Sequence, residues 1–137
     1  MADLPGLILI RHAETRQDPS RDSRDWILTE SAHDACLKLA ETLRALEPTC
    51  IVTSEEVKAR ETGRLLADAL GLPCESAPGL EEHRRRGVPF MGPEDWRRTL
   101  ERFFTEPDAR VFGQETAAEA RERFGAALAR VLERCPG

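Results

Sequence analysis

A run of apolar residues over positions 7–10 lies near the start of the chain and stops abruptly at Arg11 and His12. A short, uninterrupted apolar run is typical of a strand that is buried on both faces of a parallel sheet. We therefore predict a first strand over residues 6–11. The stretch that follows, residues 15–26, is polar and contains a proline, and this composition predicts a surface loop.

Beyond that loop, helical and strand-like patterns alternate along the chain. Apolar residues recur at helical spacing in several segments, and β-branched residues gather between them. Gly71 and Pro73 are typical of the end of a helix. The predicted elements are, in order, a helix that Thr29 or Ser31 caps and that ends by Pro48, a strand over 49–54, a helix over about 56–70, a short strand over 74–77, a helix that starts at Pro93, and a last helix over about 115–134.

The order of these elements predicts the fold class. Strands that alternate with helices form α/β folds with a largely parallel sheet. We expect an α/β protein, a three-layer α/β/α sandwich with a mostly parallel central sheet. Ligands of such folds bind at the carboxyl ends of the strands. Polar residues follow two of the predicted strands, from Arg11 and from Ser54 onward, so we expect the site there.

Composition narrows the class of protein. The 137 residues are 40% apolar and 33% charged, and the net charge of −5 disfavours nucleic acid as a partner. No apolar stretch approaches the roughly 20 residues of a membrane span. Residues 7–10 are too short for a signal peptide, so we expect a cytoplasmic protein with no membrane partner. Four separated cysteines and three histidines without ligand spacing predict free thiols, no metal and no other cofactor.

Three polar residues at the end of the first predicted strand suggest an anion site. A histidine in this place can simply cap the strand by hydrogen bonding. Arg11 changes that interpretation, because a half-buried guanidinium requires an anion. Thr15 adds a hydroxyl a few residues away. Together with His12, these groups predict a pocket for a tetrahedral oxyanion.

A second motif makes the interpretation specific. The chain contains RHAET at 11–15 and TSEEVKARET at 53–62, each after a predicted strand. The pair resembles the histidine phosphatase superfamily, the phosphoglycerate mutase-like group, whose signature is Arg-His-Gly-x-Thr/Ser and then Ser-x-x-x-Arg-Ala-x-x-Thr. Ala13 replaces the glycine. The matching residues are Arg11, His12, Thr15, Ser54, Ala59 and Thr62. The resemblance covers essentially the whole chain, and its length is similar to that of the small phosphatase branch.

The resemblance implies roles for these residues. His12 would attack phosphorus and become phosphohistidine, which a neutral imidazole can do near neutral pH. Arg11 and Thr15 would bind the phosphoryl oxygens. The second phosphate cation of the family falls on Lys58, with Arg60 as the alternative. Lysine is rare in this chain, which has lysine only at 38 and 58, and it binds phosphate as a point charge.

The leaving group needs a proton donor. The segment GLEEHRRR follows the third predicted strand, as the acid-bearing segment of the family does, and Glu82 has the Leu-x-Glu spacing from Leu80. Glu81 is the competing acid. A phosphate beside the carboxyl would raise its pKa, as a general acid requires. Arg84, Arg85 and Arg86 could instead attract an anionic substrate.

One part of the family pattern is missing. The family has a second pocket histidine in a late Ser/Thr-His-Gly turn, and this chain ends at LERCPG. His33 lies in the first predicted helix, and His83 adjoins the proposed acid on a charged loop. We expect residues 1–137 to form a single histidine-phosphatase-like domain that is incomplete at its C-terminus. An unpaired sheet edge would then favour strand exchange in a homodimer.

These observations favour an enzyme, a phosphoric monoester hydrolase that acts on a phosphomonoester or on phosphohistidine through phospho-His12. Its partner would be a small phosphorylated substrate or a phosphoprotein. A mutase is less favoured, because the sequence has no evident basic loop that would retain a second phosphate. The alternative is a phosphate- or phosphopeptide-binding module on the same fold, in which the missing histidine and Lys58 leave turnover negligible.

Overall fold

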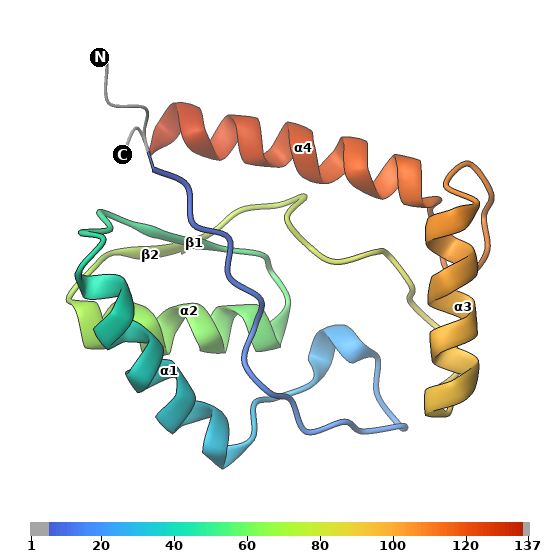
Figure 1. The fold of residues 1–137 in the computed structure, drawn as a ribbon, viewed down its shortest axis with the longest axis horizontal. Coiled ribbons are helices and arrows are strands. Elements are labelled where there is room, and N and C mark those ends of the chain that lie inside the picture. Colours follow the sequence, from blue (N-terminus) through green and yellow to red (C-terminus); the bar gives the residue numbers. More distant parts are fainter. Residues whose placement is uncertain (1–5, 136–137) are drawn as a thin grey trace.

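The computed structural model describes residues 6–135, and Figure 1 shows its elements. Helices predominate, and the strands are short. The elements are, in order, the 3-10 helix η1 (Ser23–Asp25), α1 (Glu30–Arg44), β1 (Ile51–Thr53), α2 (Val57–Leu70), β2 (Cys74–Ser76), α3 (Pro93–Thr105) and α4 (Ala117–Arg134). The predicted helices and the second and third predicted strands are therefore confirmed, with ends shifted by a few residues. No helix in the described part of the chain is long and apolar enough to cross a lipid bilayer.

The sheet lies between two layers of helices. β1 and β2 are parallel, with Ile51 opposite Cys74 and Thr53 opposite Ser76. In Figure 1, α4 lies on one side of these strands and α1 and α2 lie on the other. The α/β class with a parallel sheet is therefore confirmed.

Packing of α1 against α2 forms the main apolar cluster. Cys36, Ala40 and Leu43 of α1 are buried against Leu66 of α2. These positions follow the helical spacing that predicted the elements. At Gly63 the backbone of α2 lies so close to β1 that a Cβ atom would collide with the side chain of Thr53. The cluster therefore fixes the orientation of α2, the helix that carries Lys58.

The start and end of these helices follow from capping residues. Thr29 caps α1, because its hydroxyl accepts a hydrogen bond from the Ala32 N–H, so Thr29 and not Ser31 is the cap. Gly71 ends α2 in the left-handed conformation, with φ of 69°. The sequence pattern did not identify the capping box of α4, in which Thr116 and Glu119 bond each other's backbone N–H groups.

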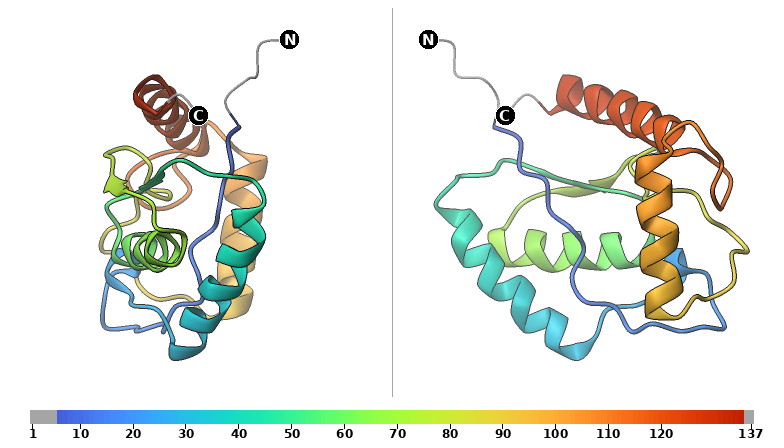
Figure 2. Two further views of the ribbon diagram at one scale, coloured as in Figure 1. Left: turned by 90° about the vertical axis from the view of Figure 1, so that its left-hand side faces the viewer. Right: turned by 45° about the vertical axis from the view of Figure 1, so that its right-hand side comes forward.

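The first predicted strand is the main error. Residues 6–11 are drawn in Figures 1 and 2 as an extended trace, and the described sheet contains only β1 and β2. Within residues 6–135, the backbone groups of residues 6–10 make no hydrogen bond to other backbone groups. A strand requires a partner as well as an apolar pattern. The side chains of Leu7, Ile8, Leu9 and Ile10 are instead exposed.

Candidate active site

All five sequence-predicted site residues line one cavity of roughly 550 Å³: Arg11, His12, Thr15, Lys58 and Glu82. They come from three separate parts of the chain. The first three lie in the segment after the apolar run, the lysine lies in the first turn of α2, and the glutamate lies in the loop after β2. The structure therefore brings together residues that are about 70 positions apart in the sequence, as in the contact between His12 and Glu82 (|i−j| = 70).

The ring of His12 is oriented by the backbone of the next residue, Ala13. Nδ1 lies 2.8 Å from the carbonyl oxygen of Ala13. Because a carbonyl only accepts hydrogen bonds, this contact places the proton on Nδ1. A hydrogen bond to an ionised Glu82 requires a proton on Nε2 as well, and Nε2 carries the lone pair that a nucleophile requires once that proton has left. Nε2 lies 3.1 Å from Oε1 of Glu82.

Thr62 joins the segment of His12 to α2. The Ala13 N–H donates to Oγ1 of Thr62 over 3.0 Å, and the same hydroxyl donates to the carbonyl oxygen of Lys58 over 2.8 Å. This bridge fixes the backbone next to His12 relative to the first turn of α2. Thr62 is therefore a positioning residue, buried behind the residues that line the cavity.

Lys58 is a buried cation, and its side chain is only 2% exposed. Nζ donates to Oε2 of Glu82 over 2.9 Å and lies 3.8 Å from Oε1 of Glu56. Two carboxylates thus compensate the charge, which makes this burial tolerable. Arg60, the alternative cation, is exposed and does not line the cavity. The geometry therefore favours Lys58 over Arg60.

Glu82 is the centre of the ion-pair network. One oxygen faces His12, and the other accepts from Lys58 and, over 3.3 Å, from Arg85. Burial raises the pKa of Glu82, but the hydrogen bond with His12 and the charge of Lys58 outweigh it and lower the pKa to about 2. The carboxyl is therefore ionised in this arrangement. The raised pKa that we expected would require phosphate beside the carboxyl.

Glu81, the competing acid, points elsewhere. Its carboxylate accepts from the Gly79 N–H and from the exposed guanidinium of Arg84. It does not line the cavity. The geometry therefore favours Glu82 over Glu81 as the acid.

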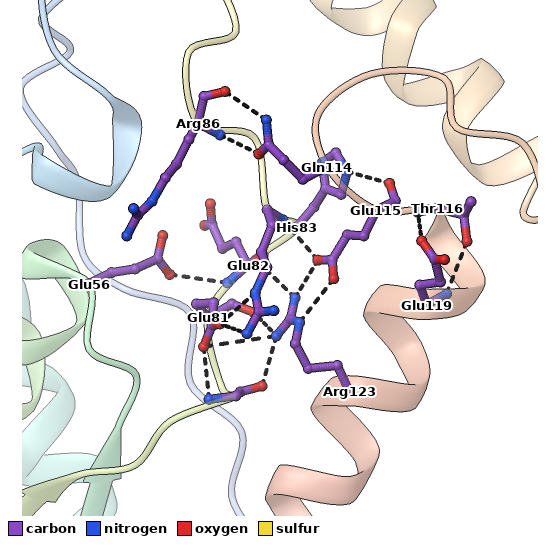
Figure 3. A network of polar contacts seen from close by, with 12 residues as sticks. Glu56, Glu81, Glu82, His83, Arg86, Gln114, Glu115, Thr116, Glu119 and Arg123 are labelled. Atoms are coloured by element: carbon purple, nitrogen blue, oxygen red, sulfur yellow. Dashed lines mark hydrogen bonds and ion pairs between the residues drawn. The ribbon is translucent and has the colours of Figure 1, made fainter.

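A network centred on Arg123 of α4 holds the loop that carries Glu82, as Figure 3 shows. The guanidinium donates to the carbonyl oxygens of Gly79, Glu81 and Glu82. It also pairs with the buried Glu115 over 2.6 Å. Burial raises the pKa of the Glu115 carboxyl, but the hydrogen bonds from Arg123 and from the Arg84 N–H outweigh it and lower the pKa. The Glu82 N–H donates in turn to Glu56 over 3.1 Å.

The remaining two predicted site residues, Arg11 and Thr15, lie at the cavity wall. Arg11 is exposed and, within residues 6–135, makes no ion pair. Thr15 is half-buried, and its backbone forms an isolated bridge with Leu28. A guanidinium without a carboxylate partner can bind an incoming anion without first breaking an ion pair.

Neither of the other two histidines joins this site. His33 is exposed on α1. His83 does not line the cavity, and its Nε2 is hydrogen-bonded to the carbonyl oxygen of Glu115 over 2.9 Å. The centroid of its ring lies 4.4 Å from that of the Phe103 ring. Burial lowers the pKa of His83, which keeps the ring neutral. It therefore supports the structure of the loop and does not take the place of the second pocket histidine of the family pattern.

Several functional contacts are not apparent from the sequence. Glu56 and Arg123 carry no predicted role, and Arg85 is predicted only as one of three arginines that could attract an anionic substrate. In the structure Arg85 lines the cavity and lies over the ring of Trp96, 4.8 Å from its centroid. The available signal was the acidic pair before Lys58 in TSEEVK, since a buried lysine requires carboxylate partners. No signal marked Arg123, which is one of many arginines on helices.

Comparison with known proteins identifies the family of this chain. The model of the histidine phosphatase superfamily (branch 1) matches residues 7–137. Two curated relatives are called probable phosphoglycerate mutase GpmB. The one from Cronobacter sakazakii is 30% identical over 94% of this chain and 64% of its own length. The one from an Enterobacter species is 33% identical over 91% of this chain and 62% of its own length.

Solved structures show the same fold. YhfR of Bacillus stearothermophilus superimposes with a TM-score of 0.73 at 22% identity, covering 93% of this chain and 67% of that one. A mycobacterial glucosyl-3-phosphoglycerate phosphatase gives a TM-score of 0.68 at 21% identity, covering 91% of this chain and 61% of that one. The fold is that of an α/β protein with a parallel sheet. The chain belongs to the histidine phosphatase superfamily, branch 1. It spans slightly less than two thirds of the length of the curated relatives that it matches.

Proposed function

We propose that this protein is a phosphatase that hydrolyses a phosphomonoester or a phosphohistidine through a covalent phospho-His12 intermediate. The observation that carries the proposal is the position of Nε2 of His12. This atom faces the cavity, 3.1 Å from Glu82, while Nδ1 is held by a carbonyl oxygen. Membership of the superfamily supports the same chemistry.

In the first step, the phosphoryl group enters between His12 and Glu82. Arg11, Lys58 and the hydroxyl of Thr15 bind its oxygens and stabilise the charge that spreads over them in the transition state. Lys58 exchanges its contact with Glu82 for one with phosphate. Glu82 loses a cation and gains an anionic neighbour, so its pKa rises and its Oε1 takes the proton from Nε2 of His12, which leaves the ring neutral. The protonated carboxyl then donates to the leaving oxygen while Nε2 bonds to phosphorus.

In the second step, water attacks the phosphorus of phospho-His12. The Glu82 carboxylate, now without its proton, accepts one from that water. Phosphate leaves and the imidazole is regenerated. A second alcohol in place of water would give a phosphoryl transfer, as the name of the GpmB relatives indicates for those proteins. Hydrolysis and transfer differ in whether phosphate appears in solution.

Trapping the intermediate tests the proposal. Brief incubation with a labelled phosphomonoester, followed by a denaturing quench, should give an alkali-stable and acid-labile phosphoenzyme. His12→Ala should lose the label, and His33→Ala, which changes an exposed histidine on α1, should keep it. Release of phosphate by the wild-type chain separates a hydrolase from a transferase.

The contacts of Glu82 also support a second function. This carboxylate already contacts the nitrogen atoms of His12, Lys58 and Arg85. A site with this arrangement could bind phosphate or a phosphopeptide with negligible turnover. Saturable phosphate binding without any covalent label would support this binding module and contradict the phosphatase.

A further inference from the structure

The cavity has two chemically distinct halves. One half carries the charged groups around His12. The other half is a wall of apolar and aromatic side chains from the residue after η1, the loop before α3 and α3 itself: Trp26, Val88, Pro89, Phe90, Met91 and Trp96. The total volume of roughly 550 Å³ lies within the range of about 300–1,000 Å³ that is typical of sites for organic ligands. A phosphate group alone would leave the apolar half empty.

The two halves meet at Trp26. The Nζ atom of Lys58 lies 6.0 Å from the centroid of the Trp26 ring. The ring of Phe90 neighbours that of Trp26, with the two centroids 6.5 Å apart. The indole N–H of Trp26 donates to the carbonyl oxygen of Asp18 over 3.0 Å, which fixes the ring. An ester whose phosphate contacts Lys58 would therefore place its leaving group next to these two rings.

The part of the cavity wall around Trp96 is also fixed. The guanidinium of Arg85 lies over Trp96 and bonds to Ser23 and Glu82, so three contacts hold it. Phe90 itself is 49% exposed in the ligand-free structure. An exposed aromatic ring at the wall of a cavity is typical of a surface that a ligand covers.

We infer that the site selects phosphate monoesters whose alcohol or phenol carries an aromatic or comparably flat apolar group. This inference rests on the proposed function, because it assigns the leaving group of that reaction. The phosphate binds among Arg11, His12 and Lys58. The apolar group lies against Trp26 and Phe90, where its burial adds affinity that a small polar alcohol lacks.

Binding can be tested without turnover. The two tryptophans of the chain, Trp26 and Trp96, both line the cavity, so intrinsic fluorescence reports on this site alone. We expect benzylphosphonate to bind about tenfold or more tightly than ethylphosphonate. Phe90→Ala should remove most of that preference. Phe104→Ala, which changes a 70% exposed phenylalanine on α3 outside the cavity, should preserve it.

Hydrolysis provides the second measurement. Benzyl and ethyl phosphate release alcohols of similar basicity, so a difference between their kcat/KM values reports on the apolar contact. We expect a preference for the benzyl ester of about tenfold or more, lost in Phe90→Ala. Equal binding and equal kcat/KM for the two ligands overturn the inference while leaving the phosphatase intact. Tight benzylphosphonate binding without phosphoenzyme or phosphate release supports the inference and contradicts the proposed catalysis instead.

Discussion

At the scale of single residues, Glu82 acts as an internal anion of the ligand-free site. Its carboxylate contacts His12, Lys58 and Arg85, which are groups that a phosphate would also contact. In the proposed reaction, substrate would therefore exchange with a carboxylate that is already bound. The same exchange would convert Glu82 from an ionised group into an acid, so binding and protonation would be linked.

The proposed acid role predicts a dependence on the leaving group. Glu82→Gln should lower kcat about 10²-fold or more for an alkyl phosphate, which needs a proton on its leaving oxygen. The loss should be much smaller for p-nitrophenyl phosphate, because nitrophenolate leaves without a proton. Glu81→Gln is the matched control, since Glu81 lies outside the cavity. Equal losses for both esters would show that Glu82 does not act as the acid.

The pKa of Glu82 also predicts how stability changes with pH. The folded state lowers this pKa from 4.5 to about 2, so the unfolded chain binds the proton more tightly. The stabilisation is complete above pH 4.5 and is lost as the pH falls toward 2. Urea unfolding of wild type and Glu82→Gln across this range should show a shallower loss in the variant. Glu81 and Glu115, whose pKa values are also lowered, leave a residual slope.

At the scale of elements, α4 controls the position of Glu82 from a distance. Arg123 holds three carbonyl oxygens of the loop, and Figure 3 shows that its charge is paired with Glu115. The Arg123 side chain therefore fixes where the carboxylate of Glu82 lies without contacting the cavity. A helix that carries none of the predicted site residues thus belongs to the functional unit.

We therefore predict two separable effects of Arg123→Gln. Removing the guanidinium leaves the buried Glu115 without its partner and should cost about 3 kcal/mol of unfolding free energy. The double variant Arg123→Gln with Glu115→Gln should regain part of this stability. It should keep a reduced kcat for alkyl phosphates with a nearly unchanged KM, because Glu82 stays misplaced while Arg11 and Lys58 still bind phosphate. Full recovery of kcat in the double variant would reduce Arg123 to a purely structural role.

Sequence patterns identified the elements of this molecule better than its long-range contacts. The motif around Lys58 and Thr62 fixed both the start of α2 and a candidate phosphate ligand, because motif and helix lie in one continuous segment. The Leu-x-Glu spacing of the family pattern indicated Glu82, because Leu80 and Glu82 also lie close together in the sequence. Arg123 acts on residues about 40 positions away (|i−j| = 41 to Glu82), and no local pattern encodes that contact.

At the scale of the whole molecule, the error in the first strand has a physical basis. Apolar composition indicates burial, but it does not specify which neighbour provides the burial. Residues 7–10 lie along a second groove that β1, α2 and α4 also line, with Phe124, Leu128 and Val131 on the α4 side. The segment is therefore extended and next to apolar surface, yet it has no backbone partner within residues 6–135.

We predict that a second copy of the chain covers this surface. Over residues 7–10, backbone groups without a backbone partner among residues 6–135 and exposed apolar side chains favour pairing between two identical edges, which a two-fold axis permits. Sedimentation velocity over a range of concentrations should show a monomer–dimer equilibrium. Leu9→Lys, at a 65% exposed position of this segment, should shift it to monomer. Leu37→Lys, at a 52% exposed position of α1 away from the groove, should leave it unchanged. A monomer at every concentration, or equal effects of the two lysines, would contradict a dimer at this edge.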